Sequence, residues 1–196
     1  IANGGIAALA LTEPGAGSDA TGMKTRFRVE GDEIVINGSK IFITNGDVCD
    51  LLVLFGKWEE LGNSKDAISI VVVEKGTPGF NVLHTEEKMG ICSSSTAALS
   101  FDNCRIPRAN LIGEPGKGLP MLFRFLNKSR PSVAVHALGI ARAAFDDAVA
   151  YINERSQSGR KIIEFQGIQF MLADMATDLA MCERWLWHVA QRIESG

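Results

Sequence analysis

Hydrophobic and polar residues alternate along short runs between about residues 25 and 106, and turn residues separate these runs. The runs are TRFRVE, EIVI, SKIFITNG, LLVLFGKW, AISIVVVE, FNVLHT and AALSFDNCRI. Alternation with a period of two is typical of half-buried β-strands. The Asn37-Gly38 pair between EIVI and SKIFITNG favours a hairpin at that point. Because no helical pattern separates the runs, they predict an antiparallel β-barrel or sandwich rather than alternating βαβ units.

From about residue 118 the pattern becomes helical. One predicted helix carries small residues on one face, and a second carries a seam of larger apolar residues at spacings of three and four. The small face comprises Ala134, Ala137, Ala141, Ala144, Ala148 and Ile152, and the seam comprises Phe165, Ile168, Leu172, Met175, Leu179, Cys182, Leu186 and Val189. Pro131 should start a straight segment or kink the first helix. SQSGRKI turns the chain between the helices, so the pattern predicts an antiparallel helical hairpin, half of a four-helix bundle.

This change of pattern predicts an α+β chain with two domains. A β domain covers residues 1–115, and the first part of a helical bundle domain covers residues 116–196. Between them, GEPGKG resembles a phosphate-binding loop only superficially, because it lacks the G-x-x-x-x-G-K-[ST] spacing and the hydroxyl that would bind a metal. We therefore interpret this stretch as a flexible connector.

Composition narrows the class of protein. The 196 residues are 46% hydrophobic and 22% charged, with a formal net charge of −3, as in ordinary globular domains. This charge argues against nucleic acid or an anionic membrane as a partner. No apolar run reaches the roughly 18 residues that cross a bilayer, so we expect no membrane insertion. The start, IANGGIAALALTEP, lacks the basic region of a signal peptide, and we interpret it as part of a domain.

The cysteines and histidines form no metal-binding pattern. The four cysteines are far apart with no C-x-x-C pair, and the three histidines are equally isolated. We expect reduced thiols in a cytosolic compartment and no bound metal.

The stretch LTEPGAGSD, residues 11–19, contains more turn residues than a plain turn needs. Gly15 and Gly17 permit left-handed backbone conformations and leave room for a ligand to touch the main chain. Thr12 and Ser18 provide hydroxyl groups. Such a loop would suit the electron-rich edge of a flat heteroaromatic ring. A bulged turn between helix and strand is the alternative, because glycine-rich loops are common.

Four stretches together resemble the acyl-CoA dehydrogenase family. They are ALTEPGAGSD, INGSKIFITNG, EKMGICSSSTAALSFDNCRIPRANLIGEPGKG and ERSQSGRKIIEFQGIQFMLADMA, and they occur in family order over nearly the whole chain. The resemblance implies FAD-dependent oxidation of an acyl-CoA thioester to a trans-2-enoyl-CoA, with electrons passing to an electron-transferring flavoprotein or a similar acceptor. It also implies a homo-oligomer, a tetramer or a dimer, in fatty acid or amino acid catabolism. The expected compartment is the bacterial cytoplasm or the mitochondrial matrix.

Family members are longer, with a helical domain before the β domain and a full helical bundle after it. The resemblance therefore implies that these residues are a piece of an enzyme. We expect the piece to be inactive by itself.

The resemblance also assigns cofactor-binding positions. They are Leu9, Leu11, Thr12, Gly17, Ser18, Phe42, Ile43, Thr44, Arg155 and Gln166. Thr12 would hydrogen-bond the flavin ring, and Ser18 would reach the cofactor or the pantetheine of the substrate. Phe42, Ile43 and Thr44 match a tripeptide that covers the ring, with the Thr44 hydroxyl near N5. The family usually has tryptophan where Phe42 stands.

Further positions lie in the helical part of the chain. Asn127 and Arg130 match residues that contact the CoA portion of the substrate. Arg155 and Gln166 match residues that reach the FAD of a neighbouring subunit. Ser158 stands where an aromatic residue is common.

The resemblance implies a glutamate as the catalytic base. Most members take it from a late loop of the C-terminal domain, and a minority take it from the position just before the arginine matched by Arg130. That position is Ser129, and a serine with no nearby histidine cannot take an α-proton from a thioester. Glu154 and Glu164 fall at helix ends of the cofactor-facing hairpin. We therefore expect no catalytic base in this chain and a glutamate beyond residue 196.

Two alternatives remain open from the sequence. One is a flavoprotein of the same fold with other chemistry, such as an acyl-CoA oxidase, an enoyl-CoA reductase or a flavin monooxygenase. The other is a non-catalytic binding module that kept the fold and lost the chemistry.

Overall fold

The computed structural model describes residues 4–195. The chain forms two compact units, one ending at Leu122 and the other beginning at Phe123. Within the described residues, none of the helices combines the length and the apolar character that crossing a bilayer requires.

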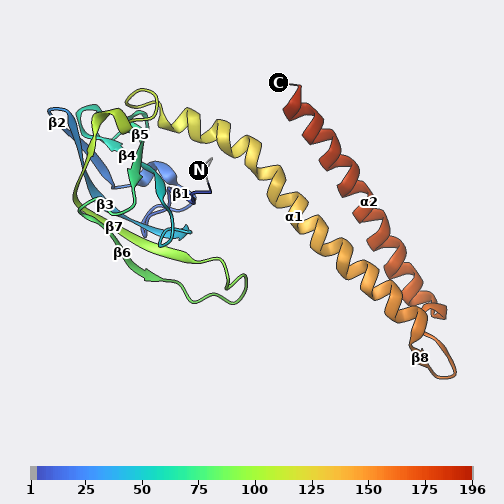
Figure 1. The fold of residues 1–196 in the computed structure, drawn as a ribbon. Coiled ribbons are helices and arrows are strands. Elements are labelled where there is room, and N and C mark those ends of the chain that lie inside the picture. Colours follow the sequence, from blue (N-terminus) through green and yellow to red (C-terminus); the bar gives the residue numbers. More distant parts are fainter. Residues whose placement is uncertain (1–3, 196) are drawn as a thin grey trace. The chain divides into compact units, whose positions relative to one another are not determined.

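The first unit is built around one curled sheet, which contains seven strands in the described residues (Figure 1). The strands are β1 (Ala7–Ala10), β2 (Arg26–Glu30), β3 (Glu33–Thr44), β4 (Leu51–Trp58), β5 (Ile68–Glu74), β6 (Phe80–Thr85) and β7 (Thr96–Pro107). Their order is β1-β4-β2-β3-β7-β6, and β5 pairs with β4. Short 3-10 turns lie between them, namely η1 (Ala20–Gly22), η2 (Glu59–Leu61), η3 (Lys65–Ala67) and η4 (Arg108–Asn110). The fold class predicted from the alternating runs is confirmed.

The sheet is mixed rather than wholly antiparallel. β4 pairs in parallel with β1 along its first half and with β2 at its last residues. The reason lies in the path of the chain. Since β3 runs back along β2, the next strand, β4, returns in the direction of β2 and can pair with it only in parallel.

The turn between β2 and β3 lies at Gly31-Asp32, where Gly31 has a φ of +63°. The hairpin predicted at Asn37-Gly38 is wrong, because both residues lie inside the twelve-residue strand β3. Gly38 instead allows a close approach. A Cβ at this position would lie 2.5 Å from the hydroxyl oxygen of Thr25.

Two bulges interrupt the pairing of β3 with β7. β7 carries one extra residue near Asn103, which has a φ of +45°, and β3 carries one extra residue near Phe42, which has a φ of +60°. Because the extra residues lie on opposite strands, the second restores the register that the first shifts.

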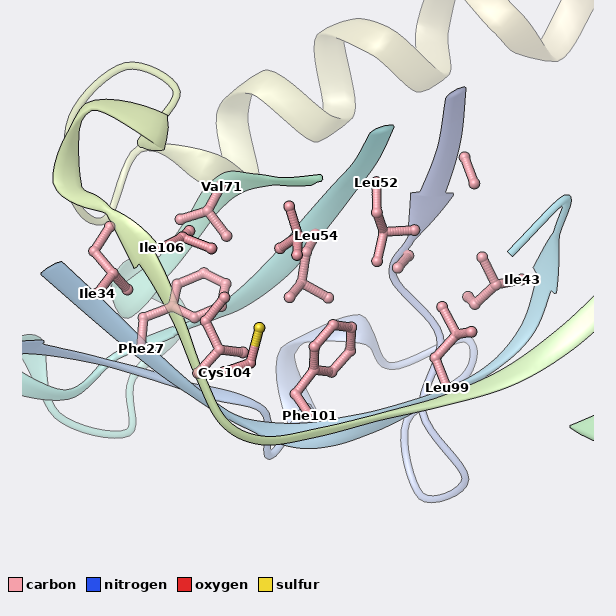
Figure 2. Packing of buried hydrophobic residues seen from close by; sticks show 14 of the residues in the cluster. Phe27, Ile34, Ile43, Leu52, Leu54, Val71, Leu99, Phe101, Cys104 and Ile106 are labelled. Carbon is pink, nitrogen blue, oxygen red and sulfur yellow. The ribbon is translucent and has the colours of Figure 1, made fainter. Parts of the chain in front are cut away.

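The inward-facing side chains of the strands fill the inside of the curl, as Figure 2 shows. Phe27, Ile34, Leu54 and Leu99 are completely buried in this cluster. Each such side chain contributes about 1.5–3 kcal/mol through removal of apolar surface from water. Gly56 admits the Phe27 ring, because a Cβ at Gly56 would lie 2.6 Å from it.

The connector after β7 packs against β5. The N–H of Ile112 donates to the carbonyl of Ile70, and the N–H of Gly116 donates to the hydroxyl of Ser69, both over 2.9 Å. A Cβ at Gly118 would lie 2.8 Å from the carbonyl oxygen of Ile68. These contacts fix the connector, so the flexible connector predicted from the sequence is wrong.

The second unit contains most of α1 (Gly118–Glu154) and all of α2 (Gln166–Glu194). The helices run antiparallel and are joined by the short strands β8 (Ser156–Gln157) and β9 (Arg160–Lys161) and the turn η5 (Ile162–Glu164) (Figure 1). This confirms the predicted helical hairpin. Pro131 lies inside α1, so the carbonyl of Asn127 lacks its usual helical N–H partner.

The two helix faces predicted from the sequence line a shared apolar groove of about 740 Å³. Its walls include Ala134, Ala137, Ala141, Ala144 and Ala148 from α1, and Met175, Leu179, Cys182 and Leu186 from α2. Leu179 is buried, but Met175 remains 43% exposed. In the described residues, the helical pair therefore leaves part of its apolar surface uncovered, as expected of half a bundle.

Candidate functional site

The loop after β1 begins with a tight turn at Pro14-Gly15. Glu13 and Ala16 close this turn by exchanging two main-chain hydrogen bonds, each 3.0 Å long. This pairing fixes the backbone of the turn without help from a ligand.

Gly15 and Gly17 are not in left-handed conformations, so that prediction is wrong. The turn is closed by its paired hydrogen bonds and needs no positive φ at either glycine. What the glycines provide is space, because a Cβ at Gly15 or Gly17 would meet no atom within 4 Å. The acid that ends the loop has a structural role. Asp19 caps η1 by accepting from the N–H and the hydroxyl of Thr21, over 3.1 and 2.5 Å.

Glu13 and Lys40 form an ion pair inside the unit, with 2.9 Å between Lys40 Nζ and Glu13 Oε1. Glu13 also accepts from the N–H of Lys24 and from the N–H and hydroxyl of Thr25, at distances of 2.6 to 3.0 Å. Lys40 Nζ donates a second hydrogen bond to the carbonyl of Leu11 over 2.9 Å. One buried pair therefore connects the loop to β3 and to the segment that precedes β2.

Burial shifts the ionisation of both partners. Burial alone would raise the pKa of the Glu13 carboxyl, but Lys40 and the hydrogen bonds from Thr25 and Lys24 hold this pKa below its ordinary value of 4.5. Burial lowers the pKa of Lys40 from 10.5 to about 8, although Glu13 opposes the change. This pair was not predicted from the sequence. The alternation of β3 could have revealed it, because Lys40 lies on the inward phase, in step with Ile34 and Ile36.

The bulge in β3 lies directly beside the loop. The N–H of Ile41 donates to the carbonyl of Thr12 over 2.9 Å. The next residue, Phe42, has a φ of +60° and a side chain that is 60% exposed. A bulky residue in this conformation carries backbone strain, which tends to persist at binding sites. The structure thus brings the predicted Thr12 and Phe42 positions together.

The remaining predicted residues of the β unit divide between surface and core. Leu9 points outward from β1 and is 37% exposed, and Leu11 is half-buried. Ser18 and Thr44 are exposed. Ile43 is 2% exposed and belongs to the core, so its side chain faces away from the loop surface.

These features fit a flat aromatic ligand. Phe42 offers an exposed ring, and Gly17 offers open space next to the main chain. The carbonyls of Leu11 and Thr12 are already bound by Lys40 and Ile41. The loop can therefore present its hydroxyl groups and free N–H groups to a ligand rather than these two acceptors.

In the helical unit, Asn127 and Arg130 are exposed on α1 and line a hollow of about 1080 Å³. Trp185, His188 and Arg192 of α2 line the same hollow. Two arginines and an amide suit a ligand with phosphate or other polar groups.

Arg155 and Gln166 lie at the opposite end of the hairpin, and both are exposed. Arg155 directly follows α1, and Gln166 begins α2. About 24 helical residues separate Arg130 from the end of α1, a distance of roughly 36 Å at 1.5 Å per residue. The structure therefore does not bring Arg155 and Gln166 together with Asn127 and Arg130.

Two of the three side chains considered as bases have local partners. The Ser129 hydroxyl donates to the carbonyl of Leu126 over 3.4 Å, and the Glu164 carboxylate accepts from the N–H of Lys161 over 3.2 Å. No group of three metal-ligating side chains gathers anywhere between residues 4 and 195.

Comparison with known proteins identifies the family of both units. Residues 8–104 match the family model described as "Acyl-CoA dehydrogenase, middle domain", and residues 116–196 match "Acyl-CoA dehydrogenase, C-terminal domain". A short-chain-specific acyl-CoA dehydrogenase of Clostridium acetobutylicum is 42% identical over 97% of this chain and 50% of its own length. An acryloyl-CoA reductase (NADH) of Anaerotignum propionicum is 46% identical over 90% of this chain and 45% of its own length.

Solved structures agree with the sequence matches. Butyryl-CoA dehydrogenase from Megasphaera elsdenii superposes with a TM-score of 0.91 at 38% identity, covering 97% of this chain and 50% of that one. The chain thus spans about half the length of the relatives that it matches. From both family models and from this likeness in fold, we conclude that the chain belongs to the acyl-CoA dehydrogenase family.

Proposed function

We propose that this chain is the flavin-contacting and CoA-contacting part of an enzyme that oxidises an acyl-CoA thioester to a trans-2-enoyl-CoA. The observation that carries the proposal is the surface where Phe42, strained and exposed, adjoins the loop at Thr12. A surface of this kind suits the isoalloxazine ring of FAD. Membership of the family supports the same assignment.

Bound FAD would provide the hydride acceptor for the reaction. Phe42 would cover the ring, Thr12 and Thr44 would donate hydrogen bonds to it, and the open space at Gly17 would let it approach the main chain. Leu9, Leu11, Ser18 and the backbone of Ile43 would complete the contact. These residues hold and orient the reacting groups, and orientation of this kind accounts for much of the rate of such reactions.

Asn127 and Arg130 would bind the CoA portion of the substrate in the hollow that they line. The α-proton must go to a base. The Ser129 hydroxyl cannot serve as one, because it stays protonated at neutral pH and a neutral hydroxyl accepts a proton poorly. We propose a glutamate outside these 196 residues for this step. The acyl chain length that the enzyme prefers depends on that same part of the protein.

Arg155 and Gln166 support a homo-oligomer, a tetramer or a dimer. Arg155 lies roughly 36 Å along α1 from Arg130, and Gln166 begins α2 at the same end of the hairpin as Arg155, so neither can share one ligand with Arg130 in the same helical unit. We propose that they reach the FAD of a neighbouring subunit, and that an electron-transferring flavoprotein takes the electrons. The four unpaired cysteines favour a reducing compartment, which we propose is the bacterial cytoplasm or the mitochondrial matrix.

The test is the colour of the full-length protein. Purified protein should be yellow, should release FAD on denaturation and should lose its flavin absorbance anaerobically when a saturated acyl-CoA is added. Protein that purifies without flavin, and that cannot be loaded with FAD, would refute the proposal and favour a non-catalytic module.

Reduction of an enoyl-CoA is the second candidate, and the 46% identity to an acryloyl-CoA reductase favours it. A reductase would consume NADH when acryloyl-CoA is added, whereas a dehydrogenase would be bleached by propionyl-CoA and reoxidised by an acceptor. Oxygen consumption with an acyl-CoA would instead indicate an oxidase.

A further inference from the structure

The ion pair of Glu13 and Lys40 is enclosed by the protein. The side chains are 6% and 0% exposed, and in the described residues no buried side-chain nitrogen or oxygen lacks a partner. The Glu13 carboxylate accepts four hydrogen bonds, three at Oε1 and one at Oε2, so both of its oxygens have partners.

A buried pair of this kind is a poor source of stability, because apolar side chains of similar volume are often as stable. Buried ionic groups can instead select one arrangement of the segments around them, since each donor and acceptor must find its partner. The segments that meet at Glu13 and Lys40 are the loop after β1, the residues before β2, and β3.

Two neighbouring contacts show what the pair holds in place. Lys40 Nζ binds the carbonyl of Leu11, and the next N–H along β3, that of Ile41, binds the carbonyl of Thr12. The bulge at Phe42 begins immediately afterwards. The side chain of Lys40 thus holds the loop after β1 beside β3, next to the point where the Phe42 ring projects outward from the strand.

We propose that Glu13 and Lys40 are positioning residues for the flavin site, which fix the register of Leu11 and Thr12 against the bulge at Phe42. The proposal rests on the proposed function, because it takes flavin as the ligand of this surface. Neither residue needs to touch the cofactor.

The experiment separates positioning from stability in the full-length protein. Lys40→Met and Glu13→Gln each leave one buried partner without its counterpart, so both should lower the thermal midpoint. The double variant Glu13→Gln/Lys40→Met removes both charges and should recover part of that loss, because the glutamine has a single acceptor oxygen for the donors of Lys24 and Thr25. It still lacks the donor to the Leu11 carbonyl, so we expect FAD to bind about tenfold more weakly or worse, with a shifted visible spectrum.

Glu33→Gln is the matched control, because it removes a carboxylate from the exposed pair of Glu33 with Arg105, at 3.0 Å. It should change neither flavin affinity nor spectrum. Should the double variant fail to fold, Glu13→Asp keeps the charge and withdraws the carboxylate by one methylene. It should then weaken FAD binding several-fold, by about one hydrogen bond, and alter the spectrum.

The outcomes distinguish the two proposals. If the wild-type protein binds FAD and a folded double variant, or a folded Glu13→Asp variant, keeps wild-type affinity and spectrum, the pair has only a structural role and the positioning proposal is wrong. If the wild-type protein binds no FAD, the proposed function itself fails.

Discussion

The N–H of Ile41 donates to the carbonyl of Thr12 over 2.9 Å, and this bond joins the glycine-rich loop to the bulged strand β3. The loop and the bulge are therefore one structural unit. Substitutions in the loop or in β3 can therefore be divided into those that lower the stability of the fold and those that weaken only ligand binding.

Gly17→Val should abolish flavin binding without lowering the stability of the chain. A Cβ at Gly17 would meet no atom within 4 Å and no positive φ is present, so the free energy of unfolding should change by less than about 0.5 kcal/mol. The branched side chain would occupy the space proposed for the ring. Flavin content after purification and a thermal unfolding scan measure the two effects.

Gly56→Ala provides the opposite control for Gly17→Val. A Cβ at Gly56 would lie 2.6 Å from the Phe27 ring, so this variant should lose about 1–3 kcal/mol of stability through overpacking of the core. A Gly17→Val protein with normal flavin content would show that the loop assignment is wrong.

Thr44→Val should leave FAD bound but slow its reduction by acyl-CoA. The substitution keeps the shape of an exposed side chain and removes one hydroxyl donor, which we expect to cost about tenfold or more in rate. Stopped-flow reduction measures the rate, and Thr85→Val at the exposed end of β6 is the matched control. Equal rates of flavin reduction in the Thr44→Val and Thr85→Val variants would show that Thr44 does not contribute to the site.

Stability should depend on pH through Glu13. Its pKa is lower in the folded chain than its ordinary value of 4.5, so the folded chain binds this proton less readily than the unfolded chain does. The resulting stabilisation is fully present above about pH 4.5 and is lost as the pH falls through the folded pKa. Urea unfolding of wild type and Glu13→Gln should therefore differ more at pH 6 than at pH 3. A difference that is constant across this range would contradict the prediction.

Ser129→Ala should leave the bleaching of the flavin by acyl-CoA within about threefold of wild type, because the Ser129 hydroxyl can at most donate a weak bond of 3.4 Å to Leu126. A glutamate outside residues 1–196, changed to glutamine in the full-length protein, should keep FAD and CoA binding but stop bleaching. If Ser129→Ala alone stops bleaching, the assignment of the base is incorrect.

The 196 residues alone should bind FAD weakly or not at all and should associate in solution. The helical pair exposes large apolar side chains such as Ile140, Trp185 and Trp187, each more than 60% exposed, and an apolar surface of this kind drives association. Gel filtration with multi-angle light scattering measures the mass. A monomer that retains stoichiometric FAD would overturn this prediction.

The sequence predicted the strands and helices well where one periodicity ran without interruption. The seam from Phe165 to Val189 follows one face of α2, and members of it such as Met175 and Leu179 line the apolar groove, which is the kind of pattern that periodicity reports directly. The hairpin at Asn37-Gly38 failed because the need for glycine there comes from Thr25, a residue distant in sequence. Contacts of this kind leave no local pattern.

The candidate site was predictable only in part. Resemblance to the family supplied positions such as Thr12 and Phe42, and the structure brings these two together. It also places Ile43 in the core, which the motif could not indicate. The partnership of Glu13 with Lys40 depends on how the loop folds over β3, and neither residue reveals it alone.

The offset bulges near Asn103 and Phe42 have a consequence for how the length of this protein can vary. The strand pairs between them are displaced by one step, and the displacement ends only because both bulges are present. An insertion or deletion at one bulge alone would carry that displacement through the rest of β3 and β7 and would exchange inward and outward side chains there. A sequence alignment that places a gap in one of these strands should therefore contain a compensating gap in the other. A design that transfers the exposed ring of Phe42 to another sheet must likewise transfer both bulges together.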